Sequence, residues 1–193
     1  MSELTIITSN IRWKDNNNIY RYIDLTSVSR ETNSIVETSE INAKNAPSRA
    51  QKSVLKNDVI FATTRPTQQR LSFIDDEYSG QIASTGYCVL RAKTDVVLPK
   101  WIFFNLTTTT FKNYVEENQS GSAYPAISDA KVKEYKIPVP SLKEQERIVT
   151  ILDKFDTLTT SISEGLPKEI DLRKKQYEYY RDLLLTFPHK EIA

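Results

Sequence analysis

The chain has 193 residues, of which 39% are hydrophobic, and its 26 basic and 25 acidic side chains leave a formal net charge of +1. This length suits one domain with an appendage, and the composition excludes a disordered tail or a strongly basic DNA coat. The single cysteine, Cys88, excludes a disulfide framework within the chain. No apolar run is long enough to span a bilayer, so we expect a cytoplasmic protein without membrane contact.

Short strand signals separated by polar turns occupy the first half of the chain. Tyr20 and Tyr22 alternate with Ile23, which predicts a strand within residues 20–28. The other elements predicted here are a short strand pair or exposed excursion within 31–42, a turn at 45–48 with a helical turn over 48–52 as one option, a turn at 56–58, buried strands at 59–63 and 87–91, and a strand at 71–74.

Helical signals begin at Pro99, which suits the first position of a short helix. A second helix is predicted around Phe111 and Val115, and Ser128 is placed to cap a third that runs to about Tyr135. Residues 137–140 are extended and carry two prolines. Short strands followed by short helices predict a compact α+β domain over residues 1–140.

A helical arm is predicted over residues 141–187, followed by a tail at 188–193. Ser141 and Glu144 form a capping-box pattern, and Gly165-Leu166-Pro167 interrupts the helix. One apolar stripe runs along the arm and includes Leu152, Phe155, Leu158, Ile162, Tyr177, Tyr180, Leu184 and Phe187. The stripe has few partners within the chain, so we expect two copies to pair through it as a coiled-coil-like homodimer. A kinked, broadly collinear arm is favoured slightly over a hairpin at residues 163–167.

The residues that catalysis needs are largely missing. His189 lies in the tail and has no histidine or cysteine companion for a metal site, and Cys88 lies in an apolar segment where a thiol is inert. The chain has four glycines and no glycine-rich phosphate loop. Asp75-Asp76-Glu77 is better explained as a solvated turn than as a nuclease site. We therefore expect a non-enzyme without metal or cofactor.

Basic and amide side chains gather in a few polar segments. Between Lys44 and Arg70 there are six basic residues and a single acid, Asp58, which is consistent with contact to a polyanion. Arginine reads guanine and glutamine reads adenine in the major groove, while hydroxyls and amines contact phosphates. The candidate DNA-binding residues are Arg49, Gln51, Lys52, Thr64, Arg65, Gln68, Gln69, Arg70, Ser122, Tyr124 and Lys131. Alternatives are a polar surface hairpin at 63–70 and a structural ion pair for Arg49.

Segments along most of the chain resemble one known family. Residues 137–187 contain IPVPSLKEQERIV, ILDKFD, SEGLPKEIDLRKKQYEYYRD and LLLTF, which closely resemble the helical spacer of specificity subunits of type I restriction–modification enzymes. Upstream, YIDLTSV, APSRAQ, NDVIFATTRP, IASTGYCVLRA and GSAYPAIS resemble the target-recognition domain of that family. Residues 1–18 match its usual first segment poorly, with Trp13 the one similar residue.

This resemblance implies a DNA sequence-specificity subunit in half-length form, with one recognition domain and one spacer. It implies that a homodimer would bind a bipartite double-stranded DNA site and dock methyltransferase and restriction subunits, which hold the cofactors. The alternative is a truncated interaction module that binds the methyltransferase and modulates assembly without specific DNA binding.

Overall fold

The computed structural model describes residues 1–160 and 166–185, and the chain divides into one unit that ends at Val149 and a second that begins at Thr150. The first unit mixes strands and short helices, which confirms the predicted α+β class. None of the helices in the described ranges is long and apolar enough to cross a membrane.

Eight strands of the described chain form two four-stranded sheets, in the orders β1-β8-β5-β6 and β3-β2-β7-β4. Neighbouring strands are antiparallel except for the parallel pair β2 and β7. The strands are β1 (Thr5–Ile6), β2 (Tyr20–Ile23), β3 (Ser39–Ile41), β4 (Ala50–Ser53), β5 (Val59–Ala62), β6 (Leu71–Phe73), β7 (Ile82–Ser84) and β8 (Tyr87–Ala92).

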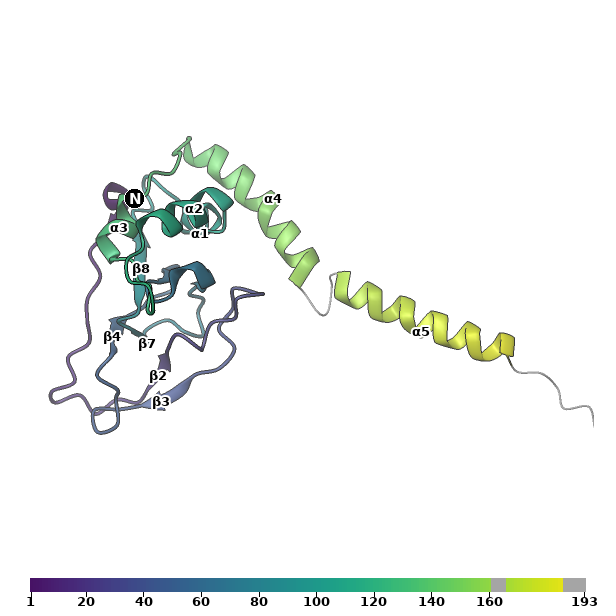
Figure 1. The fold of residues 1–193 in the computed structure, drawn as a ribbon, viewed down its shortest axis with the longest axis horizontal. Helices are drawn as coiled ribbons and strands as arrows, with labels where there is room; N and C mark the ends of the chain where they lie inside the picture. The colour runs from purple at the N-terminus through teal and green to yellow at the C-terminus, as the bar shows by residue number, and fades with distance from the viewer. Residues whose placement is uncertain (161–165, 186–193) are drawn as a thin grey trace, which may run out of the picture. The chain divides into compact units, whose positions relative to one another are not determined.

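The central strands β5 and β8 are buried on both faces. Successive side chains of a strand point to opposite sides, so each of these strands contributes to two cores. Val59 and Phe61 pack into the core that includes the helices, whereas Ile60 and Ala62 pack into the core that β2 and β7 share. The prediction of buried strands at 59–63 and 87–91 is confirmed. Figure 1 shows the same division, with the short helices in the upper part of the first unit and the strands β2, β3, β4 and β7 below them.

Three short helices cover the first sheet: α1 (Pro99–Leu106), α2 (Thr109–Asn118) and α3 (Asp129–Glu134). Pro99 begins α1 as predicted, and the Ser128 hydroxyl caps α3 by accepting the Lys131 amide at 3.2 Å. Phe111 of α2 lies with its ring centroid 5.0 Å from that of Phe61, edge to face. These contacts explain why the aromatic residues after Pro99 form packed helices.

Two strands of the second sheet were not predicted. Residues 50–53 form β4 rather than a helical turn, so the helical option at 48–52 is wrong, and β7 at 82–84 had no prediction. The sequence of β4, Ala-Gln-Lys-Ser, has weak strand propensity, and its pairing with β7 decides its conformation.

Ala50 is buried beside Tyr22 and Ile82 in a small core on this sheet. Trp13 packs against that core, and its indole donates to the Ala50 carbonyl at 2.8 Å.

Helix α4 (Leu142–Thr160) begins in the first unit, where its first turn is fixed by a buried glutamine. Gln145 is fully buried, accepts the Leu98 amide at 2.9 Å and donates to the carbonyls of Val96 and Pro140 at 3.1 and 2.9 Å. The predicted capping box is half formed. The Ser141 hydroxyl accepts the Glu144 amide at 3.4 Å, but the Glu144 carboxylate pairs with Arg147 instead of reaching back.

The second unit contains the rest of α4 and helix α5 (Leu166–Leu185). Phe155 is 62% exposed, Leu158 49% and Tyr180 51%, so these stripe residues lie largely in solvent within one chain. Ile162, Phe187, the tail and the side chains of Tyr177 and Leu184 lie outside the described residues, as does Gly165 at the helix break. The collinear and hairpin arms therefore both stay predictions.

Candidate nucleic-acid interface

A pocket of about 590 Å³ opens where four segments of the first unit meet. We call it the arginine pocket, and its lining residues are Leu25, Thr26, Arg30, Arg49, Thr64, Arg65, Gln68, Arg70 and Tyr124. The segments are the loop after β2, the residue before β4, the loop between β5 and β6, and the loop before α3. Four arginines and no acid line the pocket, so its field favours an anionic partner.

Backbone hydrogen bonds bring two distant segments together at this pocket. The Ile127 amide donates to the Thr63 carbonyl at 2.9 Å, and the Arg65 amide donates to the Pro125 carbonyl at 2.7 Å. Tyr124 therefore lies beside Arg65, whose guanidinium carbon is 5.6 Å from the centroid of the Tyr124 ring. Tyr124 is 73% exposed, so its ring is accessible to a partner. Residues that lie about 60 positions apart in the sequence thus form one surface.

The loop between β5 and β6 has an unusual backbone. The short 3-10 helix η2 (Pro66–Gln68) is flanked by Arg65 at φ 49° and Gln69 at φ 53°, both in the left-handed region. Residues other than glycine rarely adopt that region, and such positions concentrate at functional sites. The buried ring of Pro66 anchors the turn, while Arg65 stays exposed and Gln68 lines the pocket.

Arg70 lies deeper than the other predicted contacts and is partly buried. Its guanidinium donates to the Val28 carbonyl and, through Nε, to the Gln68 Oε1 atom at 3.3 Å. These bonds tie the loop after β2 to the loop between β5 and β6. The structure therefore gives Arg70 a positioning role for Gln68 in addition to its place in the pocket lining.

Gly121 is required by the loop that carries Tyr124. Its φ is +91°, and a Cβ atom placed there would lie 2.9 Å from the Tyr124 carbonyl oxygen. A side chain at this position would both strain the backbone and displace that carbonyl. Ser122 is exposed beside it and does not line the arginine pocket.

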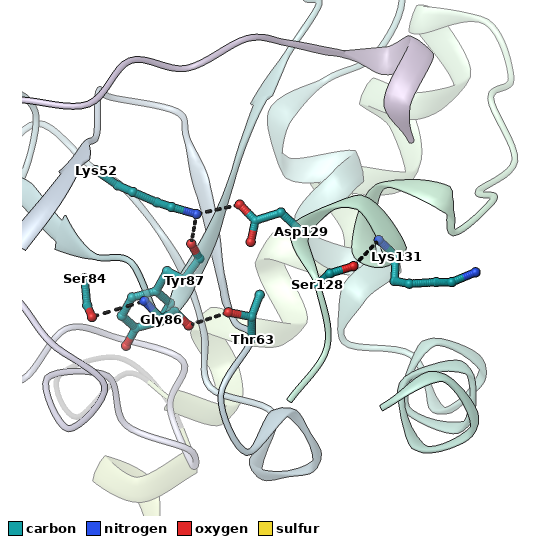
Figure 2. A network of polar contacts seen from close by, with 8 residues as sticks. All are labelled: Lys52, Thr63, Ser84, Gly86, Tyr87, Ser128, Asp129 and Lys131. Atoms are coloured by element: carbon teal, nitrogen blue, oxygen red, sulfur yellow. Dashed lines mark hydrogen bonds and ion pairs between the residues drawn. The ribbon is translucent and has the colours of Figure 1, made fainter. Parts of the chain in front are cut away.

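Lys52 and Lys131 are engaged within the protein instead of facing the pocket. The Lys52 amine donates to the Tyr87 carbonyl at 2.5 Å and pairs with Asp129 at 2.5 Å, and Figure 2 shows it between those two groups. The Lys131 amine pairs with Glu134 at 2.6 Å, and this hydrogen bond raises the pKa of Lys131. The geometry thus gives Lys52 a structural role that links β4 and β8 to α3 and argues against the phosphate contact expected for it.

The two remaining predicted glutamines also lie outside the arginine pocket. Gln51 Nε2 donates to the Ser48 carbonyl at 2.7 Å, which closes the turn before β4. Gln69 Nε2 donates to the Pro66 carbonyl at 3.2 Å and lines a separate, smaller cavity. Of the predicted DNA-binding residues, the pocket therefore brings together Arg49, Thr64, Arg65, Gln68, Arg70 and Tyr124.

Arg49 is exposed and forms no ion pair with a residue that the structure describes. An arginine that does form a structural ion pair in the domain is Arg91, which pairs with buried Asp58 through two bonds of 2.7 Å. Arg30 is the pocket residue that sequence reasoning missed. It stands alone between polar residues, and only folding brings it beside the other arginines.

Groups suited to catalysis do not gather here. Across residues 1–160 and 166–185, no three histidine, cysteine, aspartate or glutamate side chains form a cluster that could hold a metal ion. Cys88 is buried as predicted, and burial raises the pKa of its thiol to about 12. The thiol therefore stays protonated near neutral pH and is a poor nucleophile.

A family model, a curated relative and two solved structures all relate this chain to the same family. Residues 3–172 match the family model described as the type I restriction modification DNA specificity domain. The chain is 50% identical over 95 residues to the specificity subunit of the type I restriction enzymes EcoR124I and EcoR124II of Escherichia coli, which covers 49% of this chain and 24% of that protein. The fold is similar to the crystal structure of the HsdS subunit from Thermoanaerobacter tengcongensis, with TM-score 0.77 and 29% identity over all of this chain and 49% of that one.

A second solved structure, from a study of complex assembly and conformational transition of the type I restriction–modification system, has TM-score 0.74 and 30% identity. It also covers all of this chain and 49% of its own. The chain thus spans about half the length of these solved relatives and about a quarter of the Escherichia coli protein.

Proposed function

The chain belongs to the type I restriction–modification specificity-subunit family, whose members are non-catalytic recognition subunits, and from that premise we propose that its first unit reads one half of a bipartite DNA site. The observation that carries the proposal is the arginine pocket. Arg65 precedes η2 and Gln68 ends it, so both stand on one short turn at the pocket wall, and both side-chain types present paired groups to base edges in the major groove. Thr64 and Tyr124 add hydrogen-bonding groups beside them.

The pocket suits recognition better than catalysis. Its arginines attract the phosphate backbone, and the exposed Tyr124 ring beside Arg65 supplies a flat surface for stacking or a hydroxyl for a phosphate. A polar hairpin without function would not need two left-handed residues and a tyrosine brought from another loop. These features support DNA as the partner of this surface.

We further propose that two copies pair through the apolar stripe of α4 and α5 and so present two pockets to a split, palindromic site. The exposure of Leu158 and Tyr180 supports this proposal, because apolar side chains along a helix gain free energy when a second helix covers them. The assembled dimer would dock methyltransferase and restriction subunits, which would carry the chemistry.

Selection from a random double-stranded DNA pool tests the proposed function. The purified chain, with and without its methyltransferase subunit, is expected to enrich a motif of two parts at a fixed spacing. Sequence-independent binding would contradict the recognition role, and association with the methyltransferase without DNA enrichment would favour the interaction module instead.

Variants on the pocket wall test which residues read bases. Arg65→Ala and Gln68→Ala should each weaken binding to the selected site by roughly 1–3 kcal/mol, and should relax the preference at one base position. Gln51→Ala is the matched control, because its side chain closes a local turn outside the pocket. Equal losses on selected and scrambled DNA would show that Arg65 and Gln68 do not read sequence.

A further inference from the structure

A second cavity, of about 160 Å³, meets the arginine pocket at Arg30, which lines both. We call it the side groove. It lies between the loop after β2, the end of η2 and the start of α2, and its lining residues are Arg30, Asn33, Gln69, Leu71, Leu106, Thr107, Thr108, Thr109 and Lys112. Gln69 is the one residue of its lining that the sequence analysis proposed for DNA binding, and the proposed function assigns the groove no role.

The charges that line these two cavities are all of one sign. Three arginines join Arg30 in the arginine pocket, and Lys112 joins it in the side groove, whereas no acidic residue lines either cavity. The whole chain has almost equal numbers of basic and acidic side chains, 26 and 25. Positive charge is therefore concentrated along one continuous path, as expected for contact with a polyanion.

The polar groups of the side groove suit phosphates more than bases. The hydroxyls of Thr107 and Thr108 donate to the carbonyls of Phe104 and Asn105 at 2.8 Å, and the Gln69 amide nitrogen donates to Pro66. These groups are engaged within the protein, which leaves few paired donors and acceptors for a base edge.

The two cations of the side groove remain available. Arg30 and Lys112 are exposed, and neither side chain forms a hydrogen bond or ion pair with any residue that the structure describes. Positive side chains with no competing acid are suited to neutralising phosphates, and phosphate contacts carry no sequence information of their own.

We propose that the side groove holds the sugar–phosphate backbone of the DNA strand whose bases face the arginine pocket, with Arg30 and Lys112 on its phosphates. This inference rests on the proposed function. It divides the surface into a part that reads sequence, around Arg65 and Gln68, and a part that fixes the position of the duplex, around Arg30 and Lys112.

The salt dependence of binding separates these two parts. The full-length double variant Arg30→Gln/Lys112→Gln and wild type are titrated against the selected duplex and a scrambled duplex between 50 and 200 mM salt. The slope of log affinity against log salt is negative, and loss of two phosphate contacts should make it less steep by about 1.8, so that the variant loses roughly tenfold less affinity than wild type across this range. The ratio of affinities for the two duplexes should stay unchanged.

The control is Lys14→Gln/Lys136→Gln, which removes the same charge from exposed residues outside both cavities. An equal slope change in the control, or no change in the test variant, would overturn the side groove while leaving DNA recognition in place. A changed affinity ratio with an unchanged slope would also overturn it, because Arg30 and Lys112 would then read bases. Failure of wild type to bind either duplex would instead refute the proposed function.

Discussion

Asp58 and Arg91 form the buried ion pair that joins the turn before β5 to β8. Asp58 is completely buried, and its carboxylate accepts two bonds from Arg91 and one from the Leu55 amide, at 2.7 to 2.8 Å. Each acceptor oxygen is thereby satisfied, which offsets the cost of removing the charge from water. The pair fixes the start of β5, the strand that leads directly into the loop between β5 and β6.

Removal of the Asp58 carboxylate should be far more costly than removal of a surface acid. Asp58→Ala leaves Arg91 partly buried without its partner and should lower the free energy of unfolding by about 3–5 kcal/mol. Asp76→Ala removes an exposed pair with Lys56 and should cost no more than about 1 kcal/mol. Urea denaturation measures both, and similar losses for the two variants would disprove a structural role for the Asp58 pair.

At the scale of elements, α4 is attached to the first unit through Gln145. This side chain bonds three backbone groups from the segments before α1 and before α4. Helix α1 begins at the same place, because Leu98, whose amide Gln145 accepts, is the residue that precedes it. One amide therefore joins the starts of two helices.

Substitution of Gln145 tests this attachment. Gln145→Leu has a similar volume but removes the Gln145 partners of the Leu98 amide and of the Val96 and Pro140 carbonyls, which lie in partly buried bonds. A group left without a partner costs up to about 1–3 kcal/mol, and less where water reaches it. We expect faster hydrogen exchange at the Leu98 amide and easier proteolysis near residues 136–141. Gln145→Glu keeps an acceptor for that amide and serves as the comparison. Unchanged exchange at Leu98 in Gln145→Leu would contradict the attachment.

At the scale of the whole molecule, the proposed dimer depends on the apolar stripe of the helical arm. Leu158 and Thr157 are neighbours on α4, yet Leu158 belongs to the stripe and the Thr157 hydroxyl bonds back to the Asp153 carbonyl at 2.9 Å. The two positions therefore offer a matched pair for testing association.

Leu158→Glu should shift the chain from dimer to monomer, because a charge buried between helices costs several kcal/mol unless it is paired. Thr157→Glu adds the same charge outside the stripe and should leave the dimer intact. Sedimentation velocity over a range of concentrations measures the change. A wild type that stays monomeric at the highest concentration would contradict the proposed dimer, whatever the variants do.

By itself the sequence determined the α+β class, the doubly buried strands at 59–63 and 87–91, the helix that begins at Pro99 and the cap at Ser128. These features depend on the local pattern of apolar and polar residues, on residue propensities and on local hydrogen bonds. All of these involve residues that are close together in the sequence. The sequence also located the loops that carry Arg49, Arg65 and Tyr124, because their residue types are unusual together.

Only the tertiary structure decided which of these residues share a surface. Strand β4 forms because β7 pairs with it. The Lys52 amine does not face the pocket because it bonds Asp129 and the Tyr87 carbonyl. Arg30 lines the pocket although the sequence of its loop does not indicate a binding site. Gln145 looks like an ordinary surface residue in the sequence, yet it is fully buried in the fold. The physical reason is common to all four: each is placed by at least one partner that is distant in the sequence, and long-range pairing is not encoded in local pattern.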